Sequence, residues 1–391
     1  MVLDRGKMHH STVHYDYHLH HYFQNREITE LYFSTAIRSF AVSMISIFVP
    51  AYFWSLGFSV REIALYFIIY YAVIMLLMPL CFKAAARWGI RHNMIIGMLI
   101  SLLFFYLLDL VPKGFPYWIV AFIGAFYVSY YFSGYNADFA RLTKKGKAGR
   151  EMGLIRFFSS LFTLAGPLVG AIILTGFGFT ALIIAVSIFT ALAILPLLFG
   201  KDKNVPYHVS IRRMFRERNT KIVTLFEANG MIHVVSEVAW PLFIFIVLKT
   251  YFSLGWIVTF TSILIALFVL YIGKLTDKGK GLPVLTTGSS LHSVLWIIRY
   301  FITSGLSVFL VNLASSASFS MLDMPYSAFW FLKANRLKNP AEFFMMREWS
   351  MAIGRLVVLF FIFFTENLFS GFIIAAFASL VFLFLSGKVL K

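Results

Sequence analysis

The chain has 391 residues, of which 60% are hydrophobic and 13% are charged. A soluble chain has about a quarter of its residues charged, so this composition argues against a soluble enzyme. Lys and Arg number 34 against 17 Asp and Glu, a formal net charge of +17. With a mean hydropathy of +0.81, this excess indicates basic loops of a membrane protein rather than a nucleic-acid-binding surface. One cysteine, Cys81, excludes a disulfide framework and a cysteine-based metal site.

Apolar segments long enough to cross a bilayer, which takes about 20 residues, occur throughout the chain. Twelve such spans are predicted, at 29–53, 62–82, 93–111, 116–135, 151–174, 179–199, 222–248, 254–273, 284–303, 305–325, 344–365 and 368–386. The short connections carry Gly, Pro and Ser, as loops do. The first 28 residues are polar and lack the apolar core of a cleaved signal peptide. These features predict an all-α polytopic membrane protein.

The basic residues alternate between the two sides of these spans. Both tails, the loops after even-numbered spans and the first turn of the eleventh span, which carries Arg347, hold 27 of the 34, whereas the opposite loops hold only Arg61, Lys113 and Lys249. Lys and Arg collect in cytoplasmic loops, so both termini are predicted to be cytoplasmic in a multi-pass protein of the cell membrane. The alternation also supports the predicted number of spans, because a missed or extra span would reverse the sides of all later loops.

A basic polar stretch at 200–221 divides the chain into two sets of six spans. Features recur between the two sets at an offset of 191 residues, as in the pairs Pro50 and Pro241, and Tyr135 and Tyr326. The sequence therefore predicts an internal repeat. The predicted parts are a His-rich N-tail at 1–28, a six-helix bundle at 29–199, a linker at 200–221, a second six-helix bundle at 222–386 and a C-tail at 387–391.

Two short motifs accompany this plan. Residues 273–280 read Gly-Lys-Leu-Thr-Asp-Lys-Gly-Lys after the second span of the second half, while the matching loop of the first half has Ala86 in place of the Asp. Residues 166–171 read Gly-Pro-Leu-Val-Gly-Ala. With these motifs and its 6+6 spans, the chain resembles the major facilitator superfamily over residues 29–386. The resemblance implies two pseudo-symmetric bundles and secondary transport of a small solute, by symport or antiport, through alternating access.

The resemblance also implies a gate at the cytoplasmic side. Its loop motif would supply Gly273, Asp277 and Lys278, with Asp277 near Arg150 at the start of the fifth span. A solvated turn whose charges only set the topology is the alternative. The predicted gate is completed by Asp138 and Asp323, at the ends of the fourth and tenth spans.

The seventh span carries the richest set of polar side chains. Asn229, His233 and Glu237 are spaced by four residues, and Trp240 falls on the same face, within about 80°. A charge at the bilayer centre costs about 2.5–3.5 kcal/mol, so such residues usually face a cavity or a partner. We therefore predict that Glu237 and His233 share a transported proton, next to a kink at Pro241. The alternative is a structural polar contact between helices.

Arg38 lies near the middle of the first span. In the resembled family, spans 1, 4, 7 and 10 line the central cavity, so Arg38 is predicted to meet Glu237 or an anionic substrate, with a helix–helix ion pair as the alternative. Arg299, near the outer end of the ninth span, is predicted to snorkel to the interface. Further predicted cavity residues, for which helix packing is the alternative, are Tyr127 and Tyr131 in span 4 and Asn312 and Ser316 in span 10.

Several activities find no support in the sequence. Six of the ten histidines lie in the N-tail without a fixed ligand spacing, and no phosphate-binding glycine loop is present. We expect no enzyme activity, no cofactor and no metal, with membrane lipids, a small-molecule substrate and protons as partners of a monomer. The alternatives are an exporter of hydrophobic drugs or lipids and, in a different class, a membrane enzyme or sensor.

Overall fold

The computed structural model describes residues 26–144, 148–199, 202, 211–216, 218–337 and 340–389. The predicted His-rich tail and most of the 200–221 linker lie outside these residues. The described part is helical and contains no strand. The helices of the first half are α1 (Arg26–Ile45), α2 (Phe48–Ser55), α3 (Val60–Trp88), α4 (Ile90–Asp109), α5 (Tyr117–Lys144) and α6 (Ala148–Leu198). A short α7 (Ile211–Arg216) precedes α8 (Thr220–Val234), α9 (Trp240–Leu248), α10 (Tyr251–Leu275), α11 (Gly281–Ile298), α12 (Gly305–Arg336), α13 (Pro340–Thr365) and α14 (Leu368–Val389).

Nine helical stretches in the described residues are long and apolar enough to cross a membrane. One of them runs over 51 residues, about 75 Å if straight, and another over 37, so each is long enough for two spans. The backbone of both turns at a glycine with positive φ, Gly178 (84°) and Gly279 (76°), where loops were predicted. The chain is thus an all-α polytopic membrane protein, and the count of twelve spans stays a prediction.

Glycines let two helix pairs cross with their backbones in contact. A Cβ added at Gly170 of α6 would lie 2.0 Å from the carbonyl oxygen of Met44 in α1. In the second half, a Cβ at Gly354 of α13 would lie 2.0 Å from the carbonyl oxygen of Glu227 in α8. Small residues are common where membrane helices pack this closely. The predicted first and fifth spans therefore cross as the seventh and eleventh do.

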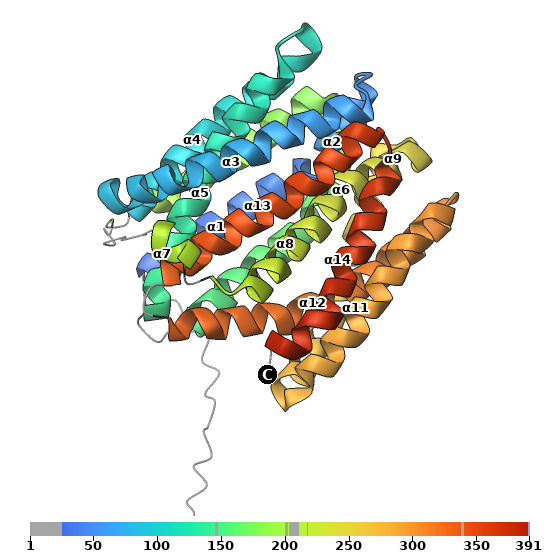
Figure 1. Cartoon of the computed structure of the whole chain (residues 1–391). Helices are drawn as coiled ribbons and strands as arrows, with labels where there is room; N and C mark the ends of the chain where they lie inside the picture. Colours follow the sequence, from blue (N-terminus) through green and yellow to red (C-terminus); the bar gives the residue numbers. More distant parts are fainter. Residues whose placement is uncertain are drawn as a thin grey trace, which may run out of the picture.

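The two halves meet along several helices. α13 packs against α3 and α8, and Figure 1 shows it running between them. α2 contacts α9, and aromatic rings fill this end of the molecule: Tyr52 stacks on Phe179 with ring centroids 3.4 Å apart, and Phe245 lies 4.6 Å from Tyr251. This aromatic cluster lies where the two halves meet, at the end of the molecule formed by α2 and α9.

At the opposite end of the first half, hydrogen bonds and an ion pair connect Asp202, the start of α4 and α1. The carboxylate of Asp202 accepts hydrogen bonds from the backbone N–H groups of Arg91 and His92, both at 3.0 Å, at the N-terminus of α4. Arg91 in turn forms an ion pair with Glu30 of α1 at 2.7 Å. Carboxylates stabilise helix N-termini, so Asp202 supplies a negative charge at the start of α4, close to the last turn of α3, where Ala86 replaces the motif's Asp.

Candidate functional site

A cavity of about 670 Å³ lies between the two halves. A few charged groups stand in a largely apolar wall, as in many small-molecule sites. The charged and titratable lining residues are Arg38, His233, Glu237, Arg347, Glu348 and Arg355. The aromatic lining residues are Tyr66, Phe67, Tyr70, Tyr71, Phe104, Phe105, Tyr127, Phe132, Tyr135, Trp330 and Phe344.

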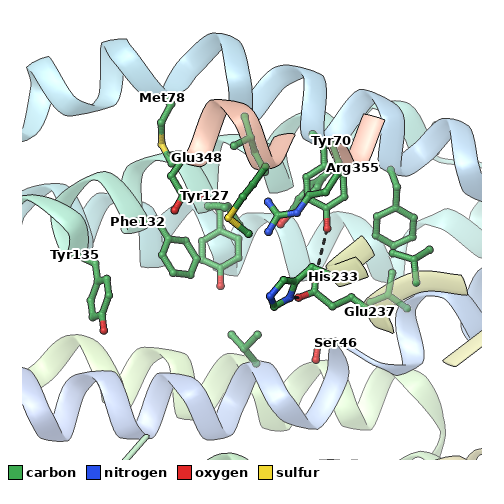
Figure 2. A pocket seen from close by; sticks show the side chains of 18 of the residues that line it. Ser46, Tyr70, Met78, Tyr127, Phe132, Tyr135, His233, Glu237, Glu348 and Arg355 are labelled. Atoms are coloured by element: carbon green, nitrogen blue, oxygen red, sulfur yellow. Dashed lines mark hydrogen bonds and ion pairs between the residues drawn. The ribbon is translucent and has the colours of Figure 1, made fainter. Parts of the chain in front are cut away.

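Glu237 connects both halves inside this cavity. Nδ1 of His233 lies 3.3 Å from its carboxylate, and the hydroxyl of Tyr71, from α3 in the first half, donates to it at 3.5 Å. The Glu237 side chain is 52% exposed and that of His233 is 30% exposed, both into the cavity. Figure 2 shows the two side chains pointing into the same part of the cavity as Arg355. The pairing of His233 with Glu237 follows the predicted spacing.

A π-helical turn, Val235–Ala239, separates α8 from α9 and contains Glu237. The regular helix is interrupted here because Pro241 lacks the N–H that would bond the carbonyl of Glu237. A π-turn adds a residue to the helix and often lies at a functional site. It also rotates the residues after it. The prediction that Trp240 shares one face with the polar residues before the turn is therefore wrong.

Five of the seven predicted cavity residues do not line the cavity: Tyr131, Asn229, Trp240, Asn312 and Ser316. The indole N–H of Trp240 donates to Asn312 at 2.8 Å, and the Asn312 amide donates to Thr261 at 2.9 Å. Asn229 is buried and Ser316 is half-buried, both outside the cavity wall. These side chains pack between helices, the alternative considered for span 10.

Arg299 does not snorkel, so that prediction is wrong. Only 3% of the residue is exposed, and its guanidinium carbon lies 3.5 Å from the ring centroid of Trp296 and 4.1 Å from that of Trp240. Two indole faces attract the cation, which explains why it turns inward.

Arg38 lines the cavity, as predicted for the first span. Its guanidinium donates a hydrogen bond to the hydroxyl of Tyr127 and lies over the ring of Tyr131, 3.6 Å from the centroid. The ring of Tyr131 thus packs against the Arg38 guanidinium outside the cavity wall, while Tyr127 lines the cavity. The structure does not pair Arg38 with Glu237, and in the described part of the chain Arg38 has no carboxylate partner.

Arg355 of α13 is a site residue that the sequence analysis missed. Its guanidinium carbon lies 4.9 Å from the ring centroid of Tyr71, and it is within electrostatic range of the carboxylates of Glu237 and Glu348. The available signal was an arginine inside the predicted span 344–365. Tyr71 and Glu237 come from distant segments, so sequence spacing could not assign them as its partners.

The predicted gate residues are only partly described. Gly273 is half-buried next to Met324 of α12, and Asp277 and Lys278 are exposed in the π-helical turn Thr276–Lys280. Asp323 accepts a hydrogen bond from Ser327 at 3.3 Å. The side chains of Asp138 and Arg150 lie outside the described residues, so the contact of Asp277 with the start of the fifth span stays a prediction.

An ion pair joins the two halves at the end formed by α2 and α9. Arg61, in the first turn of α3, lies 2.7 Å from Glu366, between α13 and α14, and both side chains are 49% exposed. The hydroxyl of Tyr251 donates to Ser55 at 2.7 Å across the same boundary. These contacts connect the two halves beside the aromatic cluster.

Replacing Arg61 by Ala is expected to open this end modestly. Exposed ion pairs contribute about 0.2–1 kcal/mol, so the ratio of open to closed states should rise by about fivefold at most. Spin labels at positions 113 and 300 would report the distance across this end. The charge swap Arg61→Glu with Glu366→Arg should restore the wild-type distribution of label distances. An unchanged distribution in Arg61→Ala would show that the ion pair does not stabilise the closed state.

The two helical halves around a central cavity define a polytopic membrane transporter. The family model of the Major Facilitator Superfamily matches residues 31–248, more than half of the chain, and the chain belongs to this superfamily. No curated protein matches the sequence.

Solved structures of transporters share this fold. The nucleoside transporter NupG matches with a TM-score of 0.66 at 14% sequence identity, covering 93% of this chain and 99% of NupG. A POT family transporter in complex with a thioalcohol-conjugated peptide matches with a TM-score of 0.75 at 14% identity, covering 94% of this chain and 97% of that one. A POT family transporter with 5-aminolevulinic acid gives 0.71, also at 14% identity and with the same coverage of both chains. Identities this low concern the fold alone.

Proposed function

We propose that the protein is a proton-coupled secondary transporter of a small solute that works by alternating access. The observation that carries this proposal is the position of Glu237. Its carboxylate faces the central cavity and is contacted by His233 of its own half and by Tyr71 of the other half. A group in this position can exchange a proton with the cavity, and its change of charge alters the contacts that it makes with both halves.

The charge of Glu237 is proposed to control the contact between the halves. Ionised Glu237 attracts Arg355 and accepts the Tyr71 hydrogen bond, which favours the arrangement seen here. A proton on the carboxylate removes that attraction and lets the bundles rock. In the present conformation, the aromatic cluster and the Arg61–Glu366 pair close one end, and the cavity extends toward Trp330 and Arg347 near the other.

The basic loops support the orientation of this cycle. Under the positive-inside rule, the end carrying the termini is cytoplasmic, so the conformation described would be open toward the cytoplasm. We propose a monomer as the working unit, because each chain contains both halves and a complete cavity.

Proton coupling is tested in liposomes that contain the protein and a trapped pH-sensitive dye. Each compound of a metabolite set is added outside, and coupling predicts that at least one moves protons only when the protein is present. Uptake of that compound should stop when a protonophore collapses the gradient. Uptake that is equal with and without a pH gradient would overturn the coupling.

The aromatic wall supports a second candidate, an exporter of hydrophobic compounds. Rings with hydroxyl tips suit amphipathic solutes as well as small metabolites. Sensitivity of cells to a panel of hydrophobic drugs, with and without the protein, separates the two, because only an exporter would protect its host.

A further inference from the structure

The charges of the central cavity are compensated with one exception. Arg347 bonds Glu348 at 2.6 Å, and His233 lies 3.3 Å from Glu237. Arg355 is within electrostatic range of both carboxylates. The remaining charge, Arg38, comes from the opposite half and has no carboxylate near it in the described residues. The cavity therefore holds a surplus positive charge at one defined place.

The surroundings of Arg38 are neutral. Its contacts are the Tyr127 hydroxyl and the faces of aromatic rings, and its buried Nε has no hydrogen-bond partner. Only 7% of the residue is exposed. An arginine keeps its charge at any relevant pH, so the buried positive charge of Arg38 cannot be removed by loss of a proton. Aromatic faces replace only part of the hydration that a guanidinium loses on burial.

The geometry leaves donors free for a ligand. The guanidinium has five N–H groups arranged to grip a carboxylate with two parallel bonds. Tyr127 accepts a hydrogen bond from Arg38, which leaves its own hydroxyl proton free to donate. Arg38 and Tyr127 both line the cavity, so a carboxylate placed there could receive bonds from both.

The remaining wall favours a flat apolar body next to this charge. Tyr70, Phe104 and Phe132 line the cavity around Arg38 and Tyr127, and the volume of about 670 Å³ suits a small molecule. Aromatic rings pack well on other rings in stacked or edge-on arrangements. Only one guanidinium is uncompensated, which suits a monoanion better than a phosphate dianion.

We propose that the cavity binds a ring-bearing organic monocarboxylate, with its carboxylate on Arg38 and Tyr127 and its ring against the aromatic wall. This inference rests on the proposed function in one respect, that the cavity is the substrate site. It deepens that proposal by naming the class of substrate, an anion whose movement together with a proton is electrically neutral.

Thermal unfolding of the purified full-length protein tests the proposal, since a ligand of the folded state raises the apparent stability. The probes are benzoate, 3-phenylpropionate and cyclohexanecarboxylate, compared with benzamide, benzylamine and phenyl phosphate. We expect the aromatic carboxylates to raise the unfolding temperature and to bind at least about tenfold more tightly than the amide and the amine. Cyclohexanecarboxylate should fall between them, and phenyl phosphate should bind more weakly than benzoate.

Three variants assign the effect to its residues. Arg38→Gln should remove the preference for carboxylates over amides, and Tyr127→Phe should weaken carboxylate binding by about two- to tenfold. Arg87→Gln, which removes an exposed arginine at the end of α3, should bind as the wild type does. If Arg38→Gln does not fold, the proposal is still tested by carboxylate binding to Tyr127→Phe and by the comparison of benzoate with benzamide on the wild-type protein.

Three results would overturn the proposal: no stabilisation by any of the carboxylates, equal binding of benzamide and benzoate, or a carboxylate preference that survives in Arg38→Gln. Binding is measured without a pH gradient. A failure of proton coupling would therefore leave these results unchanged, and a failure here would leave coupling intact.

Discussion

Replacing Glu237 by Gln is expected to abolish accumulation driven by a pH gradient while leaving exchange across the membrane intact. One pH unit stores about 1.4 kcal/mol for each proton, enough for about tenfold accumulation of a substrate carried with one proton. Gln has nearly the shape of a protonated Glu and can still accept the hydrogen bond from Tyr71, but it cannot release a proton. The variant should therefore move substrate only down its own gradient.

The measurement uses proteoliposomes in two formats with the same substrate. Under a pH gradient, substrate inside the liposomes should no longer rise above its outside concentration, while counterflow between substrate pools at equal pH should persist. Glu227→Gln is a matched control on the same predicted span, since Glu227 lies outside the cavity wall and should keep full coupling. Gradient-driven uptake at the wild-type rate in Glu237→Gln would rule out this residue as the coupling group.

Local geometry explains what could be predicted at this site. The pairing of His233 with Glu237 needs only one helical turn, and the position of Arg38 needs only the depth of the first span. The backbone breaks at Gly178 and Gly279 follow from glycine's access to positive φ in the predicted loops.

What could not be predicted depends on contacts between distant segments and on a local change of helix type. The π-turn around Glu237 changes the register of Trp240, because a constant 3.6-residue repeat no longer holds across Val235–Ala239. Arg299 meets Trp240, and Arg355 meets Tyr71 and Glu237, on other helices. A sequence pattern gives the face of a residue on its own helix but not the partner that meets this face.

Replacing Gly354 by Ala is expected to lower both thermal stability and transport. The added Cβ would lie 2.0 Å from the carbonyl oxygen of Glu227, a backbone atom that cannot turn aside like a side chain. Overpacking of this kind costs about 1–3 kcal/mol. α8 and α13 would have to separate, which moves Arg355 away from Glu237 and weakens the charge coupling between them. An unfolding temperature several degrees lower and slower uptake should appear together.

The matched control is Gly176→Ala in the first half, where an added Cβ meets nothing within 4 Å. It should unfold and transport as the wild type does. Gly170→Ala, which brings a Cβ to 2.0 Å from the carbonyl oxygen of Met44, should be destabilised as Gly354→Ala is. An unfolding temperature of Gly354→Ala equal to that of Gly176→Ala would contradict a backbone-to-backbone crossing. A lower unfolding temperature in Gly354→Ala but not in Gly170→Ala would mean that the two halves do not depend equally on these helix crossings, although each crossing contains a glycine.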